Sequence, residues 1–187
     1  MKQHINTIAR TWFYHLRRLR QIRRRAGYEV TVRLVLALIM SRVDYCNALF
    51  ANLPASTITP LQHVQNAAAR LVLQLGQRGH ISQGLRELHW LPIRAQVLYK
   101  LCVLMYDVHS GRSPAHIKDI VTARCSASHW PHSFDHRLRQ AMTLWECAFS
   151  YTGRHAWNDL PNKLRSTTNT ATFKKHLKTH FLNSVFS

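Results

Sequence analysis

Acidic residues are scarce in this sequence, and that scarcity narrows the functions it can perform. The 187 residues include 8 Asp+Glu against 26 Lys+Arg, a formal net charge of +18 with neutral histidine. Such an excess of positive charge repels itself in a compact fold unless a polyanion neutralises it. Nucleic acid is therefore the leading class of partner. An anionic membrane surface, an acidic protein and a merely solubilising basic surface are the alternatives.

The same scarcity argues against catalysis. Two-metal nucleotidyl transfer needs carboxylates that hold metal ions about 4 Å apart. The eight acids here are scattered, with none adjacent and none paired at a helical spacing. No G-x-S-x-G, P-loop or dinucleotide-binding motif is present either. We therefore expect no enzymatic activity from this chain alone, and no cofactor.

Glycine, proline and long apolar runs are also few. Six residues each of glycine and proline exclude collagen-like and linker-like compositions. The longest apolar run, Leu34–Met40, is too short to span a membrane. No two cysteines have C-x-x-C spacing, and the first 25 residues lack the continuous apolar core of a secretory signal. These absences predict an intracellular chain, nuclear or cytoplasmic and not secreted, without disulfides.

One group of side chains could in principle bind zinc. Cys125, His129, His132 and His136 lie within twelve residues, and Cys147 follows. Their spacing, C-x3-H-x2-H-x3-H, matches no familiar structural zinc module. We therefore predict no metal site.

Apolar residues recur at helical spacing along most of the chain, and no segment alternates as a strand does. We predict an all-α fold of irregular, roughly orthogonal helices, with a long loop before the C-terminal segment. The predicted divisions are a helical domain over residues 1–121, a loop or linker over 122–148 and a C-terminal helical segment over 149–187.

The first 25 residues, which contain no acid, predict a basic amphipathic helix that Gly27 can end. Arginine pairs bidentately with phosphate, and neighbouring aromatic rings can stack on bases. For Trp12, a place in the core is the favoured interpretation, because it falls on the apolar stripe. An organelle transit peptide and a helix lying on a membrane surface are the alternatives. The candidate nucleic-acid-binding residues are Arg10, Arg17, Arg18, Arg20, Arg23, Arg24 and Arg25.

Several segments, taken in order, resemble one known family. They read INTIARTWFYHLRRLRQIR (5–23), SRVDYCNALFANLP (41–54), LQHVQNAAARLV (61–72), LHWLPIRAQVLYKL (88–101), GRSPAHIKDI (111–120), HAWNDLPNKLRS (155–166) and FKKHLKTHFL (173–182). This series resembles the C-terminal part of reverse transcriptases from non-LTR (LINE-type) retrotransposons of the jockey and chicken-repeat group. Residues 122–148 depart from the family pattern.

The resemblance implies a thumb-like domain and post-thumb segment without the polymerase palm. The family's catalytic Ala-Asp-Asp turn is absent here. By resemblance, the chain would grip the backbone of RNA or of an RNA–DNA duplex, and its missing partner would be the palm. Two other hypotheses stay open: a non-functional retroelement-derived fragment with exposed apolar faces, and a basic structural component of a ribonucleoprotein.

Overall fold

The structure is a computed structural model that describes residues 2–42, 50–51, 53–76, 79–122 and 152–186. Every regular element within these ranges is helical, so the predicted all-α class is confirmed. The possible metal ligands and the predicted linker beyond residue 122 lie outside the described residues. The helices are α1 (Lys2–Val35), the π-helical turn η1 (Leu36–Met40), α3 (Ala55–Leu73), α4 (Ile81–Glu87), α5 (Ile93–His109), α6 (Ala115–Thr122), α9 (Arg154–Asn158), α10 (Asn162–Arg165) and α11 (Thr170–Phe186).

The chain divides into two compact units. Unit 1 comprises residues 1–47, 53–96 and 182–187, and unit 2 comprises residues 48–52 and 97–181. Unit 2 therefore combines residues from either side of the predicted linker. Because that linker lies almost wholly outside the described residues, the predicted division at 121 and 149 stays a prediction.

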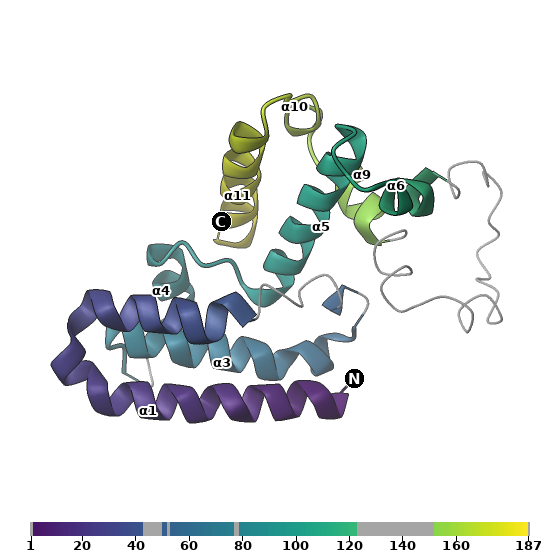
Figure 1. Ribbon diagram of the computed structural model, residues 1–187. Helices are drawn as coiled ribbons and strands as arrows, with labels where there is room; N and C mark the ends of the chain where they lie inside the picture. The colour runs from purple at the N-terminus through teal and green to yellow at the C-terminus, as the bar shows by residue number, and fades with distance from the viewer. Residues whose placement is uncertain (1, 43–49, 52, 77–78, 123–151, 187) are drawn as a thin grey trace. The chain divides into compact units, whose positions relative to one another are not determined.

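A glycine divides α1 into two limbs. Gly27 has φ 75° and ψ 178°, a non-helical conformation that glycine adopts without a steric penalty. The first limb (residues 2–26) and the second limb (residues 28–35) consequently run in opposite directions, as Figure 1 shows. The predicted basic helix over residues 1–25, and its end at Gly27, are confirmed.

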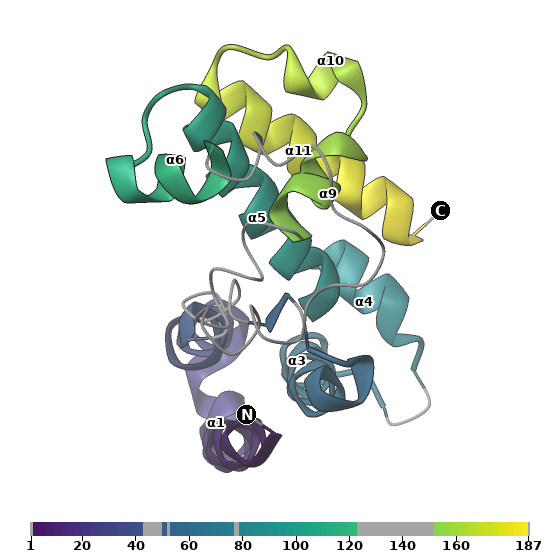
Figure 2. The same ribbon diagram turned by 90° about the vertical axis from the view of Figure 1, so that its right-hand side faces the viewer.

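The first limb packs beside α3, and the two helices run parallel (Figure 1 and Figure 2). Burial of apolar side chains on both helices stabilises this pair by about 25 cal/mol for each Å² removed from water. On the first limb these side chains are spaced alternately four and three residues apart, which keeps them on one face: Ile5, Ala9, Trp12, Leu16 and Leu19. On α3 they include Ile58, Leu61, Val64, Ala68, Leu71 and Val72.

Two glutamines on α3 hold the segment that enters α5. Gln65, only 1% exposed, donates a hydrogen bond from Nε2 to the Leu91 carbonyl at 2.8 Å. Its neighbour Gln62 donates to Gln65 Oε1 and accepts the N–H of Ile93, both at 2.9 Å. The two amides thus pair backbone groups of a connecting segment that no helix satisfies.

Three aromatic rings form the centre of unit 2. Tyr106 of α5 stacks on Phe173 of α11, with ring centroids 4.1 Å apart and planes 10° apart. Trp157 of α9 lies 5.9 Å from the Phe173 ring. The Tyr106 hydroxyl donates a 2.6 Å hydrogen bond to the Thr168 carbonyl. The cluster ties α5, α9 and α11 together, and the buried phenol keeps a hydrogen-bond partner.

Replacing Gln65 tests the role of the glutamine pair. In the Gln65→Leu variant the Leu91 carbonyl loses its donor, so we expect a loss of about 1–3 kcal/mol in the free energy of unfolding. Gln83→Leu, at an exposed position of α4, should change it by less than about 0.5 kcal/mol. Urea unfolding followed by circular dichroism measures both. Equal effects of the two variants would contradict the proposed role.

Cys102 provides a probe for unit 2. Burial, and secondarily the charge of Asp159, raises the pKa of the Cys102 thiol from 9.0 to about 12. Its Sγ donates to the Ala156 carbonyl at 3.6 Å. Because only the thiolate reacts, alkylation at about pH 8 should leave Cys102 unmodified in the native protein and modify it in denaturant. Peptide mapping by mass spectrometry measures the extent of alkylation at Cys102 separately from the other cysteines. Rapid native labelling of Cys102 would show that this packing is absent in solution.

Candidate nucleic-acid interface

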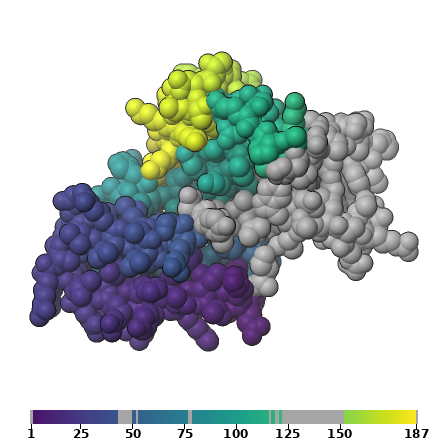
Figure 3. All heavy atoms as spheres, viewed as in Figure 1, coloured from purple at the N-terminus to yellow at the C-terminus, as the bar shows by residue number. Residues whose placement is uncertain are grey.

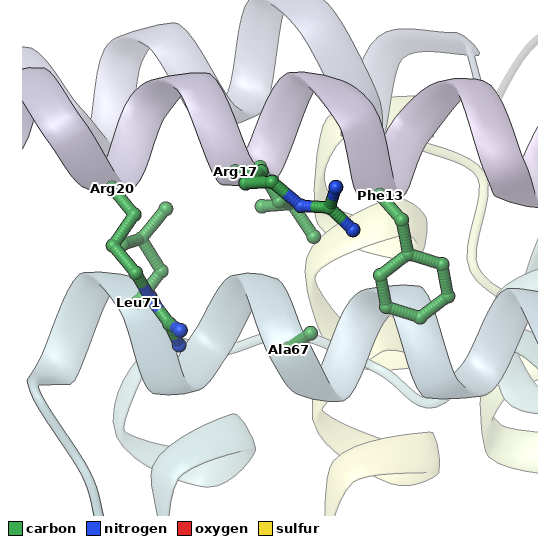
Figure 4. Close-up of a pocket in the computed structure, with 6 residues that line it drawn as sticks. Phe13, Arg17, Arg20, Ala67 and Leu71 are labelled. Atoms are coloured by element: carbon green, nitrogen blue, oxygen red, sulfur yellow. The ribbon is translucent and has the colours of Figure 1, made fainter.

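A groove runs between the first limb of α1 and α3. It consists of two adjoining hollows of about 270 and 310 Å³ that share Arg20 and Leu71. Phe13, Arg17 and Arg20 extend from α1 toward α3 in Figure 4, with Ala67 and Leu71 on the α3 side. We call it the arginine groove. Its lining residues are Phe13, Leu16, Arg17, Arg20, Arg23 and Arg24 from α1, Ala67, Arg70 and Leu71 from α3, and Gln74 and Leu75, which directly follow α3.

Helical spacing explains why these side chains gather there. Phe13, Arg17, Arg20 and Arg24 follow one another at intervals of four, three and four residues, so they occupy one side of the helix. That side borders the buried apolar stripe, which places the row along the edge of α3. Arg10 precedes Phe13 by three residues and continues the row beyond the groove.

The structure thus separates the seven predicted arginines. Arg17, Arg20, Arg23 and Arg24 line the arginine groove. Arg18 and Arg25 are exposed but fall on a different side of the helix, and they do not line it. The sequence prediction grouped all seven arginines as one surface, whereas the structure brings four of them together.

The Arg23 guanidinium forms hydrogen bonds within the protein. Arg23 continues the spacing of the buried stripe, four residues after Leu19, and its Nη2 donates to the Val72 carbonyl at 2.6 Å. With the Gln74 amide oriented so that its oxygen faces the guanidinium, that oxygen accepts from Nη1 and Nη2 at 2.9 and 3.1 Å. Val72 is in the last turn of α3, whose carbonyls lack helical partners. Arg23 therefore caps the C-terminus of α3.

Arg70 is a lining residue that the sequence analysis missed. It lies on α3, where it is the only arginine, and its Nε is buried without a hydrogen-bond partner in the structure. No charge run marks it, and nothing in the sequence indicates that α3 packs beside the arginines of α1. The available signal was weaker: α3 carries no acid, so its exposed side cannot neutralise a basic neighbour.

The groove is positively charged, and none of its lining residues is acidic. Ion pairs between described residues include Arg33–Glu29, Arg112–Asp107 and His155–Asp159, and none of these three involves the groove. Arg17, Arg20 and Arg24 are exposed, so their guanidinium groups are accessible to an anion.

The aromatic residues of the first limb differ in exposure. Trp12 is 4% exposed, so its assignment to the core is confirmed. Phe13 is 39% exposed and lines the arginine groove. Tyr14 is 57% exposed but lies outside the groove. Of the three consecutive rings, Phe13 alone is both accessible and adjacent to the groove arginines.

The described ranges contain neither a metal site nor a membrane-spanning helix. There, no three His, Cys, Asp or Glu side chains come together as a metal site. No helix among them combines the length and apolar character needed to cross a membrane. Comparisons of the chain with protein-family models, curated proteins and solved structures found no match.

Replacing Arg23 should affect stability more than replacing its neighbour. Arg23→Met removes the cap of α3, and we expect a loss of about 1–2 kcal/mol in the free energy of unfolding. Arg24→Met removes an exposed cation and should cost less than about 0.5 kcal/mol. Thermal and urea unfolding compare the two variants. A larger effect at Arg24 would show that the cap does not form.

Proposed function

We propose that this chain binds the sugar-phosphate backbone of nucleic acid in the arginine groove, without catalysis. The observation that carries the proposal is the convergence of Arg17, Arg20 and Arg24 from α1 with Arg70 from α3 on one acid-free groove. Like charges gathered without counter-charges destabilise a free protein, and a polyanion relieves that repulsion.

The chemistry of the groove favours phosphate over base edges. Guanidinium groups present planar donor pairs that match phosphate oxygens. Contacts of this kind position a nucleic acid without reading its sequence. Binding would therefore release counterions and weaken steeply as salt concentration rises.

The family resemblance supports the same activity in a larger setting. It suggests that the chain is the thumb and post-thumb part of a non-LTR retrotransposon reverse transcriptase, an RNA-directed DNA polymerase. The groove would then grip RNA or an RNA–DNA duplex inside the cell, in nucleus or cytoplasm. The absence of an Ala-Asp-Asp turn from the sequence is in keeping with a non-catalytic part, and the palm would be its protein partner.

Exposed apolar side chains on α1 and η1 support a protein partner as well. Figure 3 shows the surface that the two limbs present on one face. Five large apolar or aromatic side chains of α1 and η1 outside the arginine groove are exposed to solvent: Tyr14, Ile22, Tyr28, Val30 and Leu36. In a complete polymerase, the palm would be the candidate to cover them. In a non-functional fragment, the same surface would promote aggregation.

The salt dependence of binding tests the proposed function. Log affinity decreases linearly with log salt concentration. In the triple variant Arg17→Gln, Arg20→Gln, Arg24→Gln this negative slope should become shallower by about 2–3, because each lost phosphate contact accounts for about 0.7–0.9. Fluorescence anisotropy with labelled RNA between about 50 and 200 mM salt measures the slope.

A matched control has the same loss of three positive charges on another helix. Lys174, Lys175 and Lys178 are exposed on α11, and changing all three to glutamine should leave the slope within about 0.5 of the wild-type value. Equal slopes for the two triple variants, or affinity of the wild-type protein that does not change with salt, would overturn the proposal.

A further inference from the structure

Phosphate binding alone does not explain why an aromatic residue, Phe13, lies in the arginine groove. It occupies the row between Arg10 and Arg17, where an arginine or lysine would add to the positive charge. The residue is 39% exposed, although an apolar side chain gains by burial. Phosphate contacts make no use of an aromatic face, so the ring calls for a second kind of ligand group.

The surroundings of Phe13 leave room beside the ring. Ala67, on the α3 side of the hollow, is the smallest side chain that lines it, and Arg17 extends toward the ring from one turn away (Figure 4). The hollow has a volume of about 270 Å³ and is open to solvent along the groove. A flat group can thus approach the ring while a phosphate attached to it reaches Arg17 or Arg20.

Nucleic-acid bases have such a flat face, but in a duplex those faces are stacked within the helix. Duplexes offer proteins their phosphates and base edges, whereas single strands offer unstacked bases that stack on aromatic side chains. An apolar wedge can enter a duplex only where it projects from the protein surface. Phe13 instead lies along the wall of a groove between two packed helices, whose axes are typically about 8–10 Å apart.

We infer that the arginine groove binds a single-stranded segment, with one base stacked on Phe13 and its backbone on Arg17, Arg20, Arg24 and Arg70. This inference rests on the proposed function and specifies the form of nucleic acid that the groove selects. From Phe13 to Arg24 the helix rises about 16 Å. A single strand bound in the groove would follow the row of arginines over that length.

The test compares three labelled probes of equal length with the full chain: a single-stranded oligonucleotide, a blunt duplex and an abasic oligomer that keeps the sugar-phosphate backbone. The wild-type protein should bind the single strand more tightly than the abasic oligomer or the duplex. Phe13→Leu should weaken single-strand binding about 5- to 150-fold, the range that loss of one stacked base produces, and leave the salt slope unchanged. Phe13→Tyr keeps the ring and should restore the affinity.

Tyr14→Leu is the matched control, since it removes a neighbouring exposed ring outside the groove and should not change the affinity. Equal affinity for abasic and normal strands, or a preference for duplex, would overturn the inference while a steep salt slope kept the proposed function intact. Loss of the salt slope itself would instead remove the proposed function. A Phe13→Leu variant that weakens duplex and single strand equally would also contradict the inference.

Discussion

The parallel packing of the first limb of α1 on α3 is the constraint on which the candidate site depends. The buried stripe from Ile5 to Leu19 fixes how the first limb is rotated against its neighbour. Because the row from Phe13 to Arg24 lies directly beside that stripe, the same rotation determines which arginines face the groove. The packing that stabilises the fold therefore also positions the binding surface. A substitution that rotates the first limb about its axis would move its arginines away from Arg70.

Arg23 illustrates how closely the two roles are combined. It belongs to the basic run by sequence but to the buried stripe by spacing. Its guanidinium caps α3 by donating hydrogen bonds to the Val72 carbonyl and to the Gln74 amide oxygen. Arg20, one turn before it, and Arg24, the next residue, remain exposed along the groove. The first limb of α1 thus carries both the arginine that fixes it to α3, Arg23, and the exposed arginines that this contact positions.

Local patterns in the sequence predicted much of the fold. Apolar periodicity placed the basic helix and its end at Gly27, and the acid-free run indicated the arginines of α1. Pairing between distant segments was not predictable, because a single sequence contains no record of which helices touch. Arg70 could not be recognised for that reason, and neither could the capping role of Arg23, which requires the C-terminus of α3 to lie nearby. Phe13 could not be told from Trp12 until the rotation of the helix was known.

The parallel course of the first limb and α3 has an electrostatic consequence. Each helix has a partial charge of about −0.5 at its C-terminus, and here both negative ends lie at the same end of the groove. The arginines at that end, Arg23, Arg24 and Arg70, offset this field, so part of their charge is balanced within the protein. The potential along the groove is consequently graded, and the charge least compensated by the helix ends is that of Arg10 and Arg17. The two ends of the groove therefore differ in how far their charges are compensated, which gives the groove a direction.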